Sequence, residues 1–195
     1  MSSAAERRER ACAALMRKVG DIVGREGITP SALHAMRLAL AALGRRTDLF
    51  PAADFAMPLA QGRNHPLLVA DGDGPSLYLT IGLPGKVAAP HDHGIWCVNA
   101  AISGQERHVL YRRTDDGARP GIATVSQVGE VMVALGHGFA MADHDIHATE
   151  VIGDTPAIGL ALYGYPLTRF PSVAWYHPDL GTVRATPSRR HAIGA

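Results

Sequence analysis

Apolar residues recur along the chain with two different spacings, and the first of these is helical. Over residues 4–46, apolar positions such as Leu15, Val19 and Ile22 fall three or four residues apart, with arginine and glutamate between them. A break at 24–29 ends in Thr-Pro-Ser, a sequence typical of a helix start with proline in the first turn. The pattern predicts a pair of helices packed against the rest of the chain.

From Pro66 onward the pattern changes to short apolar stretches that are separated by glycine and aspartate turn signals. The strands expected from this pattern are 67–69, 76–81, 95–102, 106–113, 121–128, 131–133, 139–141, 147–152 and 157–163. Roughly eight to ten strands at this regular spacing predict an all-β sandwich or barrel. The sequence contains no repeat of fixed period and no dinucleotide- or phosphate-binding glycine loop.

The two patterns divide the chain into parts. We expect a helical annex over 1–48, a connector over 49–66, a β-barrel over 67–176 and a polar C-terminal tail over 177–195. A chain of 195 residues with 47% apolar residues is long enough for one core of ordinary size, with the annex attached to it.

Charge and cysteine content narrow the classes of partner and the compartment. The net charge is +1, which predicts neither nucleic acid nor a membrane surface as a partner, so a DNA-binding helix pair remains a minor alternative for the annex. Residues 1–10 are charged and lack the apolar segment of a signal peptide, and no apolar run reaches membrane-spanning length. Cys12 and Cys97 are expected to be free thiols, and the protein is expected to be cytoplasmic.

Three histidines form the candidate chemistry. His91 and His93 flank one residue, so in an extended segment both side chains point to the same side and can bind one ion. A His-x-His pair alone is weak evidence for a metal site, because ten histidines in 195 residues produce such pairs by accident. His147, at the start of a later predicted strand, supplies a third ligand if a closed or doubled sheet brings the strands together.

The segment Pro-His-Asp-His-Gly at 90–94, with Gly85 before it, Gly104 after it and the later segment 129–147, resembles the two motifs of the cupin superfamily. Within it, residues 67–167 resemble the thiol dioxygenase group, which includes cysteine dioxygenase, bacterial 3-mercaptopropionate dioxygenase and uncharacterised bacterial relatives. The resemblance implies a mainly β fold, a double-stranded β-helix or jelly roll, with an N-terminal helical annex.

The resemblance also implies roles for individual residues. His91, His93 and His147 match the three iron ligands of that group. Typical cupins carry a glutamate ligand a few residues after the His-x-His pair, and that neighbourhood here is Trp96-Cys97-Val98. Cys97 and Tyr163 match the two residues that form a thioether cross-link in mammalian-type cysteine dioxygenases. Both are therefore candidate catalytic residues, although a small buried apolar side chain is an equally good interpretation of Cys97.

Two features depart from the group. Its Ser-x-His-x-Tyr series reads here as Gly159, Ala161 and Tyr163, so the tyrosine lacks both partners. The arginine that grips the substrate carboxylate falls at His65, with Arg63 two residues away.

Three further histidines have no assigned role. Any of His108, His137 and His144 is a possible substitute for the histidine that is missing from the Ser-x-His-x-Tyr series. A surface or turn position is the simpler interpretation of each.

The predicted protein is a mononuclear non-haem iron oxygenase that adds dioxygen to a small thiol resembling cysteine or 3-mercaptopropionate. Fe(II) is the expected metal, with zinc or nickel as alternatives, because imidazole suits all three. His65, Arg63 and Trp96 are the predicted substrate contacts. The alternatives are a non-oxidative metal cupin, an isomerase or hydrolase, and a non-catalytic binding cupin. A homodimer is possible.

Overall fold

The computed structural model describes residues 2–55, 65–70, 72–170 and 172–187, and it begins with two helices. Helix α1 (Ala4–Glu26) starts at a capping box in which Ser3 accepts a hydrogen bond from the Glu6 N–H while the Glu6 carboxylate accepts one from the Ser3 N–H. Helix α2 (Pro30–Gly44) starts at Thr29, whose hydroxyl caps the Ala32 N–H. The predicted helical pair is confirmed.

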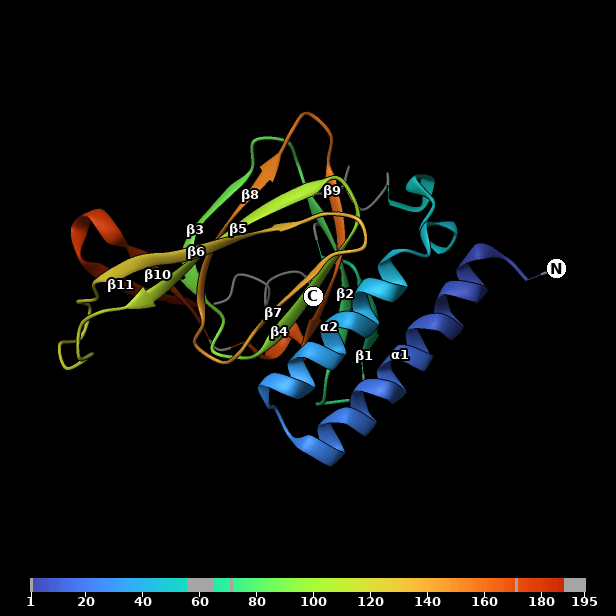
Figure 1. Cartoon of the computed structure of the whole chain (residues 1–195), viewed down its shortest axis with the longest axis horizontal. Helices are drawn as coiled ribbons and strands as arrows, with labels where there is room; N and C mark the ends of the chain where they lie inside the picture. The colour runs from blue at the N-terminus through green and yellow to red at the C-terminus, as the bar shows by residue number, and fades with distance from the viewer. Residues whose placement is uncertain (1, 56–64, 71, 171, 188–195) are drawn as a thin grey trace.

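Two antiparallel sheets follow the helices (Figure 1). Their strands are β1 (Leu67–Ala70), β2 (Ser76–Gly82), β3 (Val87–Asp92), β4 (Cys97–Ser103), β5 (Gln105–Arg113), β6 (Val125–Val133), β7 (Gly138–Met141), β8 (Ile146–Ile152), β9 (Ala157–Tyr163), β10 (Ser172–His177) and β11 (Thr182–Pro187). The first sheet has the order β1-β2-β9-β4-β7 and the second β11-β10-β3-β8-β5-β6. Strands that are far apart in sequence, such as β3 and β8, therefore become neighbours.

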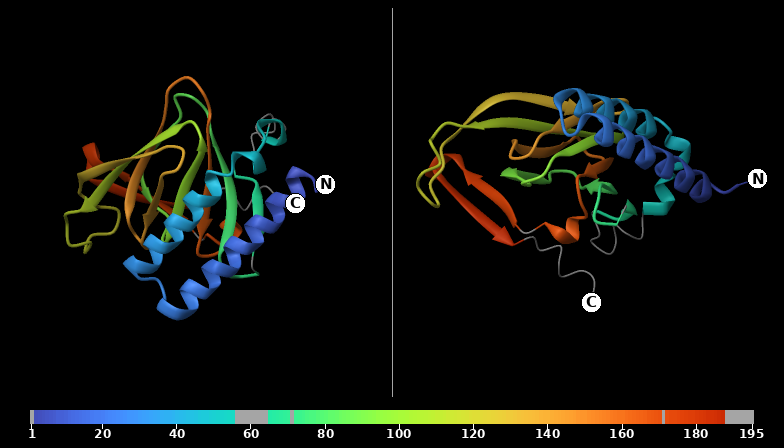
Figure 2. Two further views of the ribbon diagram at one scale, coloured as in Figure 1. Left: turned by 45° about the vertical axis from the view of Figure 1, so that its right-hand side comes forward. Right: turned by 90° about the horizontal axis from the view of Figure 1, so that it is seen from below.

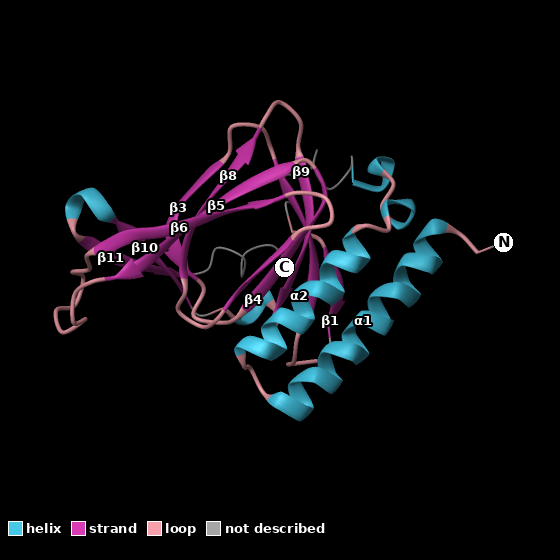
Figure 3. Ribbon diagram, in the orientation of Figure 1, coloured by secondary structure: helices cyan, strands magenta, loops and turns pink. Residues whose placement is uncertain are grey.

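The helices cover one face of the first sheet, and the other face of that sheet lines the interior between the two sheets (Figure 2). Alternation along β9 shows the division, since Leu160 and Leu162 pack in the cluster shared with the helices while Ala161 and Tyr163 pack in the interior cluster. Figure 3 shows the same separation of helices from strands, with the β10–β11 hairpin on the side of the sheets opposite the helices. The fold is a mainly β jelly roll with N-terminal helices, as predicted.

Several predicted elements differ from the structure. The predicted strands 121–128 and 131–133 are one strand, β6, because Gly129 pairs with Leu110 of β5 instead of ending the ladder. Two strands lie where none was predicted, β3 and β10, and the predicted tail contains a third, β11. Strand β11 was missed because the stretch after residue 176 was interpreted as a polar tail, and it pairs with β10 along its whole length.

One 3-10 helix, Thr47–Leu49, spans the boundary between the predicted annex and the predicted connector, and a second, Ala52–Phe55, lies in the connector. Most of the remainder of the connector lies outside the described residues. Within the described part of the chain, neither long helix has a stretch apolar enough to cross a membrane.

Candidate metal centre

The pairing of β3 with β8 brings the three predicted ligands together. His91 lies directly opposite His147 in this ladder, and His93 follows at the residue after β3. The chain turns immediately afterwards, since Gly94 adopts a φ of 63° and its N–H donates a 3.0 Å hydrogen bond to the Asp92 carboxylate. The doubled sheet expected from the sequence is present, and within it the site is supplied by β8 and by β3 with the residue that follows it, two neighbouring strands of one sheet.

The three imidazoles are buried, and one potential ligand atom from each lies within 4.8 Å of the others. The Nδ1 of His91 lies 2.8 Å from the Ala89 carbonyl oxygen, so Nδ1 carries the proton and Nε2 is left as the ligand atom. The Nε2 atoms of His147 and His93 are 3.4 Å apart. Two nitrogens bound to one ion at about 2.0 to 2.1 Å stand roughly 2.9 to 3.4 Å apart, so the donor set fits a single metal ion.

Burial also keeps the His147 imidazole neutral, which is the state that binds a metal ion. Desolvation, assisted by the neighbouring His91, His108 and His93 rings, holds the pKa of His147 well below its usual range. The His147 ring is therefore neutral at pH 7, and a nitrogen lone pair is available for a metal.

A cavity of about 850 Å³ opens beside the three histidines. Its other polar lining groups are His65, Thr80, Lys86, Asn99, Glu106, His108, Thr149, Tyr163, Trp175 and Thr186. Trp175 of β10 stands opposite His91 in the sheet, and the two ring centroids are 4.6 Å apart. A space of this size holds a small substrate beside the ion.

Tyr163 lines the cavity, and Cys97 lies directly opposite it in the β4–β9 ladder. The Tyr163 ring centroid is 5.6 Å from that of His93, so this tyrosine packs beside a predicted ligand. Cys97 is fully buried and is absent from the cavity lining, and the Asn99 amide lies 3.6 Å from its sulfur. The structure therefore brings the two predicted catalytic residues together, with only Tyr163 facing the cavity.

Of the three predicted substrate contacts, only one is found at the cavity within the described residues. His65 lines the cavity, and Arg63 lies outside the described residues. Trp96 does not line the cavity and is buried instead in the cluster shared with the helices. The tryptophan in the cavity wall is Trp175, which the sequence analysis did not single out.

Polar groups on the flanking strands lie beside the two positions where the resemblance implied serine and histidine. Thr80 of β2 pairs with Gly159, and a Cβ at Gly159 would stand 2.9 Å from the Thr80 hydroxyl. Asn99 of β4 pairs with Ala161. Both Thr80 and Asn99 line the cavity, so a hydroxyl and an amide remain available near Tyr163.

His108 is the histidine that sequence reasoning left unassigned and that the structure brings to the site. Its Nδ1 lies 3.1 Å from the Nδ1 of His147, and it is 2% exposed. His137 is exposed, and the largely exposed His144 lies 3.9 Å from Asp92. The alternation of β5 could have placed His108 on the inner face, but nothing in the sequence shows that β5 pairs with β8.

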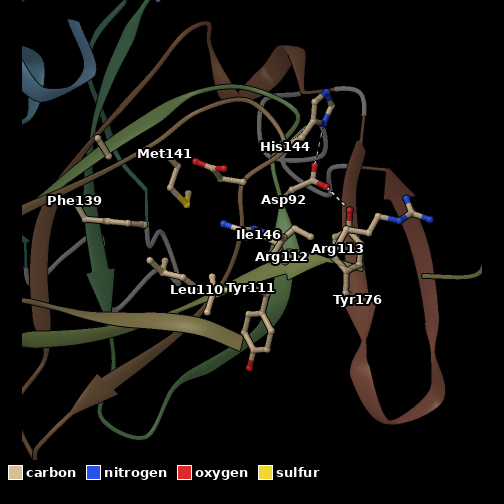
Figure 4. Close-up of a pocket in the computed structure, with 13 residues that line it drawn as sticks. Asp92, Leu110, Tyr111, Arg112, Arg113, Phe139, Met141, His144, Ile146 and Tyr176 are labelled. Carbon is tan, nitrogen blue, oxygen red and sulfur yellow. Dashed lines mark hydrogen bonds and ion pairs between the residues drawn. The ribbon is translucent and has the colours of Figure 1, made fainter. Parts of the chain in front are cut away.

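A second cavity, of about 460 Å³, lies beside Asp92, the residue between His91 and His93 (Figure 4). The Asp92 carboxylate accepts a 2.7 Å hydrogen bond from the Tyr176 hydroxyl, and burial together with this carboxylate raises the pKa of Tyr176. Glu150 of β8 is ion-paired with Arg107. Neither Asp92 nor Glu150 lines the cavity of the metal centre.

No family model matches this chain, and no curated protein matches it. Solved structures that align with part of it include oxalate oxidase in complex with the substrate analogue glycolate, at 18% identity and a TM-score of 0.38, over 47% of this chain and 42% of that chain. Another is a Cupin_2 domain of an XRE family transcriptional regulator from Enterobacter cloacae, at 20% identity and a TM-score of 0.37, over 52% of this chain and 95% of that chain.

A third is an uncharacterised protein with a double-stranded β-helix domain from Klebsiella pneumoniae subsp. pneumoniae MGH 78578, at 17% identity and a TM-score of 0.35, over 52% of this chain and 70% of that chain. The chain thus spans about two fifths of the oxalate oxidase that it matches. The fold and the three-histidine cluster together define the class of protein, a jelly roll with a possible metal centre inside it.

Proposed function

We propose that this protein is a mononuclear non-haem iron oxygenase that resembles the thiol dioxygenases and oxidises a small thiol. The observation that carries the proposal is the set of three buried imidazoles, with no carboxylate among them, beside a cavity that Tyr163 also lines. Three neutral ligands leave the charge of Fe(II) uncompensated, and this favours an anionic substrate such as a thiolate.

The overall reaction is R–SH + O₂ → R–SO₂H, in which the sulfur is oxidised and both oxygen atoms enter the product. Fe(II), when bound, supplies neighbouring positions for the thiolate and dioxygen and so removes most of the entropic cost of their meeting. The protein supplies Tyr163, whose hydroxyl is a hydrogen-bond donor to the reacting atoms, and Thr80 and Asn99, which offer polar groups near it. Trp175 shields the centre from water.

A substrate carboxylate would find a lysine and a histidine at the cavity in place of the arginine of that group. His65 and Lys86 both line the cavity, and no arginine does so among the residues that the structure describes. Lys86 is exposed. An ammonium group is a weaker and less directional partner for a carboxylate than a guanidinium, so we expect modest affinity for thiols resembling cysteine or 3-mercaptopropionate.

Metal content of the purified protein tests the centre. We expect about one iron per chain in the wild type, since three ligands define one site, and none in a His91→Ala, His93→Ala double variant. His137→Ala is the matched control, because it removes an exposed imidazole away from the cavity and should leave the metal content unchanged. Equal metal content in all three proteins would contradict the site.

Oxygen uptake with a panel of small thiols tests the reaction. The iron-loaded wild type should consume oxygen with at least one thiol and yield the sulfinic acid, while Tyr163→Phe should lose much of this rate, roughly 10- to 100-fold for a lost acid-base or hydrogen-bonding group. Peptide mapping would show whether turnover joins Cys97 to Tyr163. No oxygen uptake by an iron-loaded protein with any thiol would reject the proposal.

One observation supports the non-oxidative alternative. Glu106 lines the same cavity and supplies a carboxylate that can act as a general base in an isomerase or a hydrolase. Zinc or nickel would be the metal in that case. Zinc in the purified protein, together with an absence of oxygen uptake after iron loading, would favour this function.

A further inference from the structure

We propose that His108 and Glu106 are positioning residues that fix the tautomer of His147 and so direct its Nε2 to the metal. The inference rests on the proposed metal centre. It concerns two residues of β5, a strand that carries none of the three ligands but pairs with β8, which carries His147. Both side chains line the same cavity as the ligands.

The contact between the two histidines requires an asymmetric arrangement of protons. The two Nδ1 atoms are 3.1 Å apart, a hydrogen-bond distance at which one nitrogen must donate and the other must accept. In the first arrangement His147 Nδ1 donates, which leaves its Nε2 bare for a metal. In the second arrangement His108 donates, and His147 then carries its proton on Nε2, which faces His93 Nε2 at 3.4 Å. Only the first arrangement is ready for metal.

Glu106 selects between these arrangements. Its Oε2 lies 3.5 Å from His108 Nε2, a buried nitrogen that makes no hydrogen bond within the described residues. In the first arrangement that nitrogen carries a proton, and a small movement of the Glu106 side chain completes a charge-assisted hydrogen bond. In the second, a bare lone pair faces a carboxylate in a region of low dielectric, which costs free energy. The carboxylate therefore favours the metal-ready tautomer.

Ring packing holds His108 in place for this role. Its ring meets that of His147 edge to edge in nearly the same plane, with centroids 5.3 Å apart and an interplanar angle of 22°. Phe139 covers it at a centroid distance of 4.9 Å. The side chain is therefore fixed by aromatic contacts, and its replacement by phenylalanine should preserve the packing while removing both nitrogens.

Nitrogen-15 NMR of the metal-free wild type tests the tautomers directly. We expect the proton on Nδ1 of His147 and on Nε2 of His108 at neutral pH. In Glu106→Leu the selecting carboxylate is gone, and we expect His147 to populate the other tautomer. A proton on His147 Nε2 in the wild type, or a doubly protonated His108 that donates to His147, would overturn the inference.

Binding of Co²⁺ to the purified protein, followed by its visible absorption, tests the consequence. His108→Phe should weaken Co²⁺ binding roughly 10- to 100-fold, the usual cost of losing a residue that orients a metal ligand. His108→Gln, whose amide oxygen can accept from His147 Nδ1, should restore much of the affinity, and His137→Phe is the exposed control. Wild-type affinity in His108→Phe would overturn the inference.

The two experiments separate this inference from the proposed function. If the wild type bound no Co²⁺, the metal centre would be rejected, while the tautomers of the metal-free protein would still decide whether Glu106 acts on His147. If Co²⁺ bound as expected but no thiol was oxidised, the positioning role would stand and the proposed reaction would fail. If His108→Phe did not fold, Glu106→Leu would carry the test alone.

Discussion

Both thiols of the chain are shielded from water. Burial raises the pKa of Cys97 from its ordinary value of 9.0 to about 12, against a smaller opposing effect of the Asn99 amide. Burial likewise raises the pKa of Cys12, to about 11. A buried neutral thiol is a poor nucleophile, so Cys97 contributes to the interior as a small apolar side chain unless the proposed chemistry modifies it.

The raised pKa of Cys97 predicts a loss of stability in alkali. Its folded pKa lies above its ordinary value, so its contribution to stability is complete below about pH 9 and is lost as the pH rises from 9.0 toward about 12. Urea unfolding in a non-thiol reductant should show that Cys97→Ala removes about 1.4 kcal/mol per pH unit from the wild-type slope in this range. Equal slopes for the two proteins would show that Cys97 ionises freely in the folded state.

Residue patterns in the sequence located the three histidines but not their environment. The His-x-His pair can be recognised from the two-residue period of a single extended segment, which is visible in the sequence. Glu106 and His108 reach the site only through the pairing of β5 with β8, which the sequence does not show. Trp96 was placed in the cavity although it immediately precedes the inward-facing Cys97, and alternation turns it toward the helices. A strict use of the two-residue period could have found that error.

At the scale of elements, helix α2 sits close on strand β4. A Cβ at Gly44, the last residue of α2, would meet the carbonyl oxygen of Ala101 at 2.6 Å, closer than van der Waals contact allows. The atom that such a Cβ would meet is a backbone oxygen, which cannot move away as the end of a flexible side chain could. Glycine at position 44 therefore allows the end of α2 to pack directly against the backbone of β4.

A matched pair of glycine substitutions tests this contact. Gly44→Ala should destabilise the protein by about 1 to 3 kcal/mol through overpacking. Gly20→Ala, inside α1 with nothing within 4 Å of its Cβ position, should stabilise it by about 0.5 to 1 kcal/mol. Denaturant unfolding of both variants gives the two free energies, and a stabilising effect at Gly44 would show that the helix can shift away from the strand.

The β10–β11 hairpin places Trp175 against the metal centre, and this placement predicts a fluorescence response. The chain has two tryptophans, of which Trp175 stacks near His91 and Trp96 lies in the helix-facing cluster. Binding of Co²⁺ should quench the emission of the wild type and of Trp96→Phe, because Trp175 is retained in both. Trp175→Phe should lose most of the quenching, and a full response from that variant would place the metal elsewhere.

Strand order and helix packing could not be predicted in the same way as strand positions. Turn signals separated most strands correctly, but Gly129 was taken as a break although it lies within a continuous ladder with β5. Strand β11 was missed because it lies in a stretch that was interpreted as a polar tail, although it pairs with β10 along its whole length. Local sequence marks where strands end, whereas partner choice depends on contacts between segments that are distant along the chain.

For the whole molecule, the largest core and the metal centre are separate. The cluster shared by both helices and the first sheet includes Leu40, Leu79, Leu160 and Leu162, all fully buried, and none of the three histidines belongs to it. The ligands lie on the second sheet and directly after β3. We therefore expect this apolar core to form without an ion, unlike small metal-dependent domains that unfold when the metal is removed.

This separation predicts that metal adds to stability without being needed for folding. At a free metal concentration of 100 times the dissociation constant, binding adds about 2.7 kcal/mol, which raises the Tm of a chain of this size by roughly 5 to 11 °C. A chelator should reverse the shift and leave a cooperative unfolding transition, because the apolar core remains. His147→Ala should show no metal-dependent shift while retaining that transition. Calorimetry with and without metal measures both effects, and a chelated wild type with no cooperative transition would mean that the ion is structural, because the core would then depend on it.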